Sequence, residues 1–301
     1  MKSFSLKSRF GFNFYDIFIY MFCISFALIC FYPMWYVLIV SLMSTEEFLR
    51  KSVIILPPLK PTLEFYRAVI QGKAFYRSFF LSVAKASAGT IGSIIISSMA
   101  AYGVTKKHVK GMKAINLIVI LTMFFSGGLI PTFLLYKFIG IFNTFWVMVL
   151  PSLMSAGNFV IMRNYFSFQV PVELEESALL DGANEVIIFF KIVVPVSVPM
   201  LSALSLFTAI GHWNDWYSYL IFCTDTRLRP FIELLRRVLI NPNEYLRGLA
   251  EVTSNPGATF ALPPASLKMT TIVIALLPII IVYPFLQKYF VKGIMIGALK
   301  E

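Results

Sequence analysis

Six long apolar runs constrain the fold of this chain more than any other feature of its sequence. They lie at about 15–43, 78–104, 114–136, 141–162, 193–222 and 269–291. A helix needs about 20 apolar residues to cross a bilayer, and its backbone hydrogen bonds are all satisfied internally. Only 14% of the residues are charged, whereas soluble domains hold about a quarter. The sequence therefore predicts an all-α, polytopic membrane protein with six transmembrane helices.

Positive charge in short segments predicts the orientation of these helices. The first ten residues carry Lys2, Lys7 and Arg9 and no acid, and the turn after the second run carries Lys106, Lys107, Lys110 and Lys113. Dense positive charge next to spans marks the cytoplasmic side. Basic residues summed over whole segments do not separate the two sides, so local density is the argument. We expect both termini to be cytoplasmic, with residues 1–14 forming a cytoplasmic N-terminal arm.

The segment from Pro171 to Pro199 is the longest acidic, small-residue stretch of the chain. Glu173, Glu175 and Glu176 follow Pro171, and carboxylates in a first turn oppose the positive end of the helix dipole. Gly182 ends or bends this helix, and Asn184 can cap a second short helix that contains Phe189. This pattern predicts a helix–turn–helix elbow at the membrane surface, over residues 171–191.

The elbow resembles a known motif. Glu176-Ser177-Ala178 is followed after three residues by Gly182, and after nine more by Ile192-Val193-Val194-Pro195. This is similar to the E-A-A-x3-G-x9-I-x-L-P motif of bacterial ABC importer permeases, with Ser177 and Val194 as conservative departures. The alternative is an ordinary amphipathic loop.

The resemblance implies that residues 15–301 form one transmembrane domain of the type I ABC importer permease (MetI-like) fold. It also implies that the elbow at 171–191 is the coupling helix that docks on the ATPase. The residues then expected to couple to the ATPase are Glu173, Glu176, Ser177, Ala178, Asp181, Gly182, Ala183 and Phe189.

Three further elements resemble the carbohydrate class of these permeases. They are the Pro-Thr-Leu-Glu-Phe-Tyr string at 61–66, the Gly-His-Trp-Asn-x-Trp string at 211–216 and the tail around Lys292-Gly293. They are similar to the G subunit of maltose importers, and particularly to the branch that handles complex or uronate-containing oligosaccharides, such as alginate importers. The resemblance implies a permease subunit that forms half of the translocation pathway of an importer for oligosaccharides, acidic ones included.

The fifth apolar run predicts a substrate pathway. Sugars stack on aromatic rings and need amide and carboxylate partners for their hydroxyls. An acid within a span should face a cavity or a partner, and Lys85 in the second run is our first candidate for the partner of Asp215. The predicted pathway residues are Lys85, Asn158, Trp213, Asn214, Asp215 and Trp216. The alternatives are an interfacial aromatic belt, a Lys85 that snorkels outward, and an Asn158 that joins two helices.

Other features bear on packing and on the substrate's charge. The second run is rich in small residues, including Gly89 and Gly92, which allow helices to approach closely. The string at 126–131, Ser-Gly-Gly-Leu-Ile-Pro, should break the third helix. Five arginines concentrate in the segment 223–268. They either attract a polyanionic sugar or form a solvated surface.

Several classes of function are disfavoured. The chain has no G-x-x-x-x-G-K-[ST] phosphate loop, so ATP and Mg²⁺ should bind on partner subunits. Its two histidines, His108 and His212, are too few and too distant for a metal cluster, and the three cysteines suggest neither a metal site nor a disulfide framework. We expect no enzyme activity, no catalytic residue, no metal and no cofactor in this chain.

The resemblance implies the partners: a homologous second permease, two ATP-binding subunits, an extracellular or periplasmic solute-binding protein, the oligosaccharide and membrane lipid, but no nucleic acid. The expected location is the cytoplasmic (inner) membrane. The competing hypothesis is a proton-coupled secondary sugar transporter that uses Asp215, His212 and Lys85 as a relay.

Overall fold

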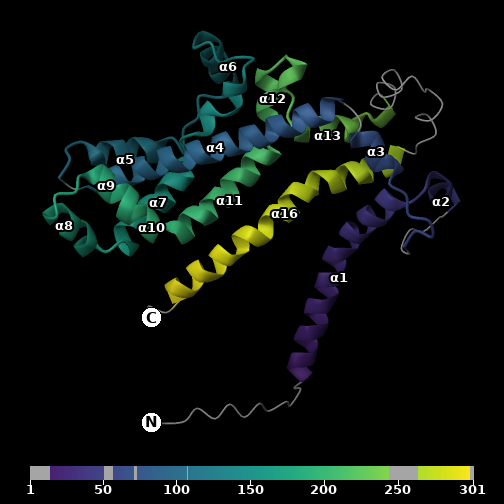
Figure 1. Cartoon of the computed structure of the whole chain (residues 1–301), viewed down its shortest axis with the longest axis horizontal. Coiled ribbons are helices and arrows are strands. Elements are labelled where there is room, and N and C mark those ends of the chain that lie inside the picture. The colour runs from purple at the N-terminus through teal and green to yellow at the C-terminus, as the bar shows by residue number, and fades with distance from the viewer. Residues whose placement is uncertain (1–13, 51–56, 71–72, 107, 244–263, 299–301) are drawn as a thin grey trace. The chain divides into compact units, whose positions relative to one another are not determined.

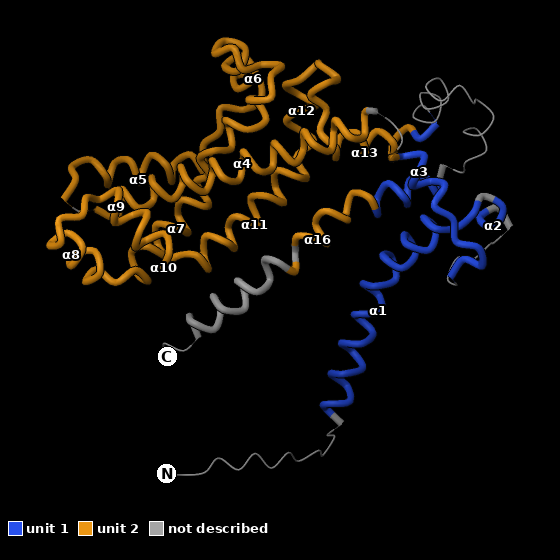
Figure 2. The backbone as a smooth tube through the Cα atoms, in the orientation of Figure 1, with its two compact units in different colours: residues 1–69, 242–273 blue, residues 70–241, 274–301 orange. Residues whose placement is uncertain are grey.

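The computed structural model describes residues 14–50, 57–70, 73–106, 108–243 and 264–298, and within these ranges the regular elements are all helices (Figure 1). The predicted arm at 1–14 lies outside the described residues except for Phe14. The chain divides into two compact units (Figure 2). Unit 1 comprises Met1–Val69 and Pro242–Val273, and unit 2 comprises Ile70–Asn241 and Ile274–Glu301.

Unit 1 contains α1 (Phe14–Leu42), α2 (Thr45–Arg50), most of α3 (Glu64–Ile70) and the first part of α16 (Pro264–Ala298). Polar contacts join these elements. The Ser41 and Tyr66 hydroxyls lie 2.8 Å apart, and the Thr270 hydroxyl donates to the Ser41 carbonyl at 3.3 Å. Thr62 accepts a hydrogen bond from the Glu64 N–H at 3.2 Å and so caps the start of α3.

Unit 2 is built around α4 (Lys73–Thr105), against which α7 (Ala156–Gln169) and α11 (Val198–Asn214) pack most extensively (Figure 1). Unit 2 also contains the part of α16 from Ile274 onward and the helices α5 (Met112–Leu121), α6 (Leu129–Phe138), η1 (Phe145–Met148), η2 (Leu150–Ser152), α8 (Val172–Leu180), α9 (Glu185–Ile188), η3 (Phe189–Val193), α10 (Val194–Val196), α12 (Tyr217–Phe222), η4 (Thr226–Leu228) and α13 (Phe231–Ile240). Of these, η3 is a π-helix.

The predicted spans are helical, but the structure breaks three of them. In the described residues, four helical segments are long and apolar enough to cross a membrane: Tyr15–Leu42, Ala74–Thr105, Phe145–Gln169 and Ala265–Val282. The third predicted span is two shorter helices, α5 and α6, separated at the predicted Ser-Gly-Gly string. The fourth, predicted at 141–162, begins as the short 3-10 turns η1 and η2. The fifth, predicted at 193–222, is bent by 83° between Val196 and Val198 and interrupted again at Asp215.

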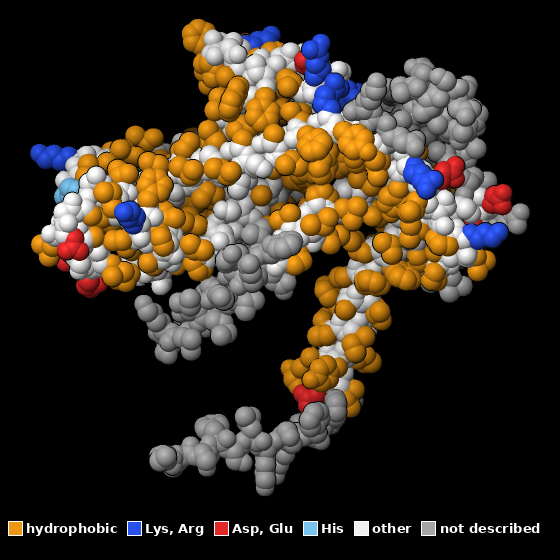
Figure 3. Space-filling model, viewed as in Figure 1, with side chains coloured by type: hydrophobic (Ala, Val, Ile, Leu, Met, Phe, Trp, Pro, Cys, Tyr) orange, Lys and Arg blue, Asp and Glu red, His pale blue; other side chains and the backbone are white. Residues whose placement is uncertain are grey.

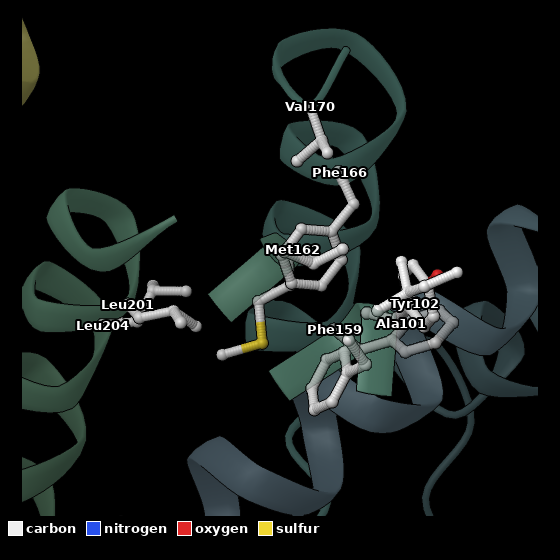
Figure 4. Packing of buried hydrophobic residues seen from close by; sticks show 11 residues of the cluster. Ala101, Tyr102, Phe159, Met162, Phe166, Val170, Leu201 and Leu204 are labelled. Atoms are coloured by element: carbon white, nitrogen blue, oxygen red, sulfur yellow. The ribbon is translucent and has the colours of Figure 1, made fainter. Parts of the chain in front are cut away.

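A buried apolar cluster holds one end of unit 2 together. It joins α4, α7, α9, η3 and α11, and its labelled members converge in Figure 4. Fully buried Phe159 and Met162 of α7 lie among Ala101 and Tyr102 of α4 and Leu204 of α11. These side chains bury apolar surface and fill the space between the helices. The cluster therefore fixes the base from which the elbow projects.

The surface of unit 2 is as apolar as a membrane protein requires. Hydrophobic side chains cover the middle of its visible face, and the charged side chains lie toward its edges (Figure 3). Large apolar side chains such as Ile91, Leu117 and Phe207 are more than half exposed on this chain. This distribution is expected where lipid or another apolar subunit replaces water.

Small residues bring α4 and its neighbours together, as predicted. A Cβ atom on Gly89 would collide with the imidazole ring of His212 in α11, and one on Gly92 would collide with Leu153. These glycines leave room for side chains of the facing segments. Close approach of this kind supplies van der Waals contact in lipid, where the hydrophobic effect between helices is absent.

This packing generates a prediction with an internal control. Gly89→Ala should destabilise unit 2 by about 1–3 kcal/mol, because the added methyl displaces the buried His212 ring. Gly103→Ala, on the same helix but with nothing within 4 Å of the added atom, should be neutral or stabilising. The midpoint of thermal unfolding of each purified variant in detergent measures both. Equal midpoints for the two variants would contradict the packing argument.

Candidate functional site

A buried ion pair joins α4 to the end of α11. The Lys85 ammonium donates to the Asp215 carboxylate at 3.0 Å and to the Asp215 backbone carbonyl at 2.6 Å. The Lys85 side chain is fully buried, and 26% of the Asp215 side chain is exposed. The predicted pairing of these two residues is therefore confirmed, and Lys85 does not snorkel to the surface.

The local backbone explains why Lys85 makes two contacts with one residue. Asp215 has extended dihedral angles (φ −77°, ψ 100°) and separates α11 from α12. A break in a helix at this depth leaves backbone groups that need partners. Lys85 satisfies the Asp215 carbonyl, and Asp215 Oδ1 accepts a hydrogen bond from the Ser218 N–H at 3.1 Å. One lysine thus stabilises both the acid and the interruption of the helix.

A cavity of about 400 Å³ lies next to this ion pair. Most of its polar lining is uncharged: Ser93, Ser152, Ser155, Asn158, Thr208, His212 and Ser218, with Asp215 as the carboxylate. The Asn158 side-chain amide donates to the Thr208 hydroxyl at 3.0 Å. Asn158 therefore lines a cavity and also joins α7 to α11.

The other predicted pathway residues of the fifth run lie outside this cavity. Trp213 is buried and packs on the rings of Phe79 and Phe231. Trp216 stacks against the Arg236 guanidinium, 4.2 Å from its ring centroid. Neither of them nor Asn214 lines the cavity. Thr208, Gly211 and Asp215 recur at helical spacing and define the lining face, so Trp213 and Asn214 fall on other faces.

The elbow has the predicted form. α8 runs from Val172 to Leu180, and Gly182 follows with φ +83°. The Asn184 side chain accepts a hydrogen bond from the Ile187 N–H at 2.9 Å and so caps α9. A left-handed residue at this point ends the first helix and reverses the chain. Nothing lies within 4 Å of a Cβ placed on Gly182, so its outer side is open.

Polar contacts fix both limbs of the elbow to the end of α4. Lys106 pairs with Glu175 of α8 and, at 3.2 Å, with Glu185 of α9. The Tyr102 hydroxyl donates to Glu185 at 2.8 Å, and the Lys106 ammonium lies 4.2 Å from the centre of the Tyr102 ring. Partial burial acts to raise the pKa of Glu185, but the hydrogen bonds from Tyr102 and Lys106 outweigh it and hold the pKa below its usual value.

The predicted coupling residues differ in exposure. Glu173, Glu176, Ser177, Asp181 and Gly182 are exposed, and Ala178 and Ala183 pack partly against the buried cluster. The structure corrects the prediction for Phe189, which is 4% exposed and packs against Tyr102 inside the core. Leu180, which is not among the predicted coupling residues, is 90% exposed at the tip of the elbow.

These features define a class of protein: a helical membrane subunit with a polar cavity among its helices and a rigid, exposed elbow at one end. The chain belongs to the permease subunits of carbohydrate ABC importers. No protein-family model matches the sequence; membership rests on the following relatives and structure.

The relatives match almost the whole chain. It is 37% identical over 286 residues to the polygalacturonan/rhamnogalacturonan transport system permease protein YtcP of Bacillus subtilis, covering 95% of this chain and 98% of YtcP. It is 30% identical over 282 residues to the trehalose/maltose transport system permease protein MalG of Thermococcus litoralis, covering 91% and 93%. A crystal structure of a bacterial ABC transporter involved in the import of the acidic polysaccharide alginate contains a chain with a TM-score of 0.83 and 27% identity, covering 92% of this chain and 96% of that one.

The ion pair predicts asymmetric effects of substitution. Asp215→Asn leaves the fully buried Lys85 without a counter-ion and should cost about 3–5 kcal/mol of stability. Lys85→Met leaves a carboxylate that the cavity can hydrate, so its cost should be smaller. The double variant should recover most of the loss, because no unmatched charge remains. Thermal unfolding midpoints in detergent test this order, and a double variant no more stable than Asp215→Asn would contradict it.

Proposed function

We propose that this chain forms half of the translocation pathway of an ATP-driven importer for acidic, uronate-containing oligosaccharides. Its partners are a homologous second permease, two ATP-binding subunits and a solute-binding protein outside the membrane. In this proposal both termini face the cytoplasm, and ATP and Mg²⁺ are held by the ATP-binding subunits, so this chain needs no cofactor of its own.

The cavity beside Lys85 and Asp215 is the observation that supports this proposal most. Its hydroxyl and amide groups can both donate and accept hydrogen bonds, as sugar hydroxyls require. Its carboxylate is matched by Lys85 at 3.0 Å, so the site does not present an uncompensated negative charge to an anionic sugar. YtcP is named for a polygalacturonan/rhamnogalacturonan transport system, and the solved structure belongs to a transporter involved in the import of alginate. Polygalacturonan and alginate are both acidic polysaccharides, which favours an acidic substrate for this chain as well.

The elbow supports the coupling half of the proposal. Its open tip presents Leu180 and the exposed side of Gly182, which another protein's surface can approach closely. Lys106, which directly follows α4, fixes the elbow to the end of that helix, and Lys85 of α4 lies 21 residues earlier, about 30 Å along the helix axis. Movement of the elbow during ATP binding would thereby displace the helices that line the cavity. Coupling requires that the ATPase contacts differ between the two states.

Membership of the ABC permease family removes the grounds for the proton-coupled alternative. The residues proposed as its relay have a structural explanation, since Lys85 neutralises Asp215 and the His212 ring packs against Gly89. They need no proton-carrying function to account for their presence in the membrane.

Gly182 offers a test of the coupling proposal. Gly182→Arg should abolish uptake by the assembled transporter and leave ATP hydrolysis intact, because a bulky cation occupies the open tip. Any side chain here adds about 1–2 kcal/mol of left-handed strain. Gly182→Asn is the control, since Asn tolerates this conformation best. Uptake and ATPase activity should both survive in it, and normal uptake by Gly182→Arg would refute the docking role.

The substrate proposal can be tested in proteoliposomes that contain the complete transporter and its binding protein. ATP-dependent uptake of labelled trigalacturonate should exceed that of neutral maltotriose by about tenfold or more, which corresponds to about 1.4 kcal/mol. Equal uptake of the two sugars would reject the acidic substrate class but not the coupling mechanism. Uptake that continues without ATP would reject the coupling mechanism.

A further inference from the structure

A second, larger pocket lies at the elbow end of unit 2, away from the cavity beside Asp215. Its volume is about 600 Å³, and it opens between the α4–α5 turn, α5 and α7. This size falls within the range of about 300–1,000 Å³ that is typical of ligand sites. Its lining combines basic groups with exposed apolar ones: Lys106, Lys110, Lys113 and Arg163 among the first, and Val109 and Phe168 among the second.

Three of these four cations are not neutralised within the described part of the chain. Lys106 is taken up by Glu175 and Glu185. Lys110, Lys113 and Arg163 make no ion pair with a carboxylate among the residues that the structure describes, and no acidic residue lines the pocket. Like charges gathered around a cavity without a counter-ion favour an anionic ligand.

Arg163 is held in place by neutral groups. Its Nη1 donates to the Asn116 side-chain oxygen at 2.8 Å, and its Nη2 and Nε donate to the Asn164 oxygen at 2.6 and 3.2 Å. These bonds occupy three of the five N–H groups of a guanidinium and leave its charge intact. The side chain is therefore oriented before any ligand binds, which reduces the entropy lost on binding.

An apolar stripe on α5 continues from the basic group. Lys113, Leu117 and Leu121 follow one another at four-residue spacing, so they lie along one side of the helix. Leu117 is 56% exposed and Leu121 is 41% exposed. The stripe runs from the α4–α5 turn along an apolar helix of the membrane domain. A ligand with one anionic end and one hydrocarbon end would match both parts.

We propose that this pocket binds the headgroup of an anionic phospholipid. The phosphate would lie against Lys110, Lys113 and Arg163, and an acyl chain would lie along Leu117 and Leu121. A soluble phosphate shares the headgroup chemistry but has nothing to place on the stripe. Basic pockets at the cytoplasmic ends of membrane helices are suited to such headgroups. This inference does not depend on which sugar is transported.

Native mass spectrometry of the complete, delipidated transporter tests the proposal. Phosphatidylglycerol and phosphatidylcholine with the same acyl chains are titrated in turn, and glycerophosphoglycerol and inorganic phosphate serve as competitors. The Lys110→Gln/Lys113→Gln variant removes two exposed charges that make no ion pair in the structure, so folding should be unaffected. Lys191→Gln is the matched control, since it removes an exposed cation from the elbow outside the pocket.

The expected result is retention of phosphatidylglycerol in preference to phosphatidylcholine, with affinity falling roughly 30-fold in the double variant and unchanged in the control. Neither soluble competitor should displace the lipid at equal concentration. Equal retention of the two lipids, or unchanged affinity in the double variant, would overturn the proposal. Displacement by inorganic phosphate at equal concentration would show that the pocket takes a soluble anion, and would overturn it as well.

Discussion

A lysine can remain charged inside a membrane helix only where its charge is matched, and the position of Lys85 depends on that condition. Its ammonium contacts both the carboxylate and the backbone carbonyl of Asp215. The same contact therefore balances a charge and stabilises the break between α11 and α12. The adjoining cavity depends on this arrangement, because Asp215 and Ser218 form part of its wall.

The same helix, α4, holds the elbow at its C-terminal end. Close to its last turn, Tyr102 and Lys106 hold Glu185, and Lys106 also holds Glu175. Between the two polar sites, Gly89 and Gly92 allow neighbouring segments to approach the helix closely. Cavity and elbow thus belong to one packed body whose common axis is α4. Residues far apart in sequence, such as Glu175 and Asp215, are linked through it.

The sequence predicted those features of the structure that depend on local patterns of residues. Apolar runs located the helices, Gly182 and Asn184 located the turn of the elbow, and the cost of an isolated charge pointed to the pairing of Asp215 with Lys85. Periodicity could not decide which of two adjacent rings, Phe189 or Phe190, faces the core, since that depends on the partner helix. It also missed the interruption at Asp215, because the apolar run continues across it. The position of Trp213 in an aromatic cluster depends on Phe79 and Phe231, which are distant in sequence.

The bend between α10 and α11 has a mechanical consequence. The two arms meet at 83°, so a displacement along the axis of the first arm has almost no component along the axis of the second. A force applied lengthwise to the first arm would therefore tilt α11 instead of sliding it through the bilayer. Tilting leaves the inserted length of α11 nearly unchanged. It avoids dragging polar groups such as His212 through hydrocarbon, and the geometry of the bend therefore favours rocking over piston motion.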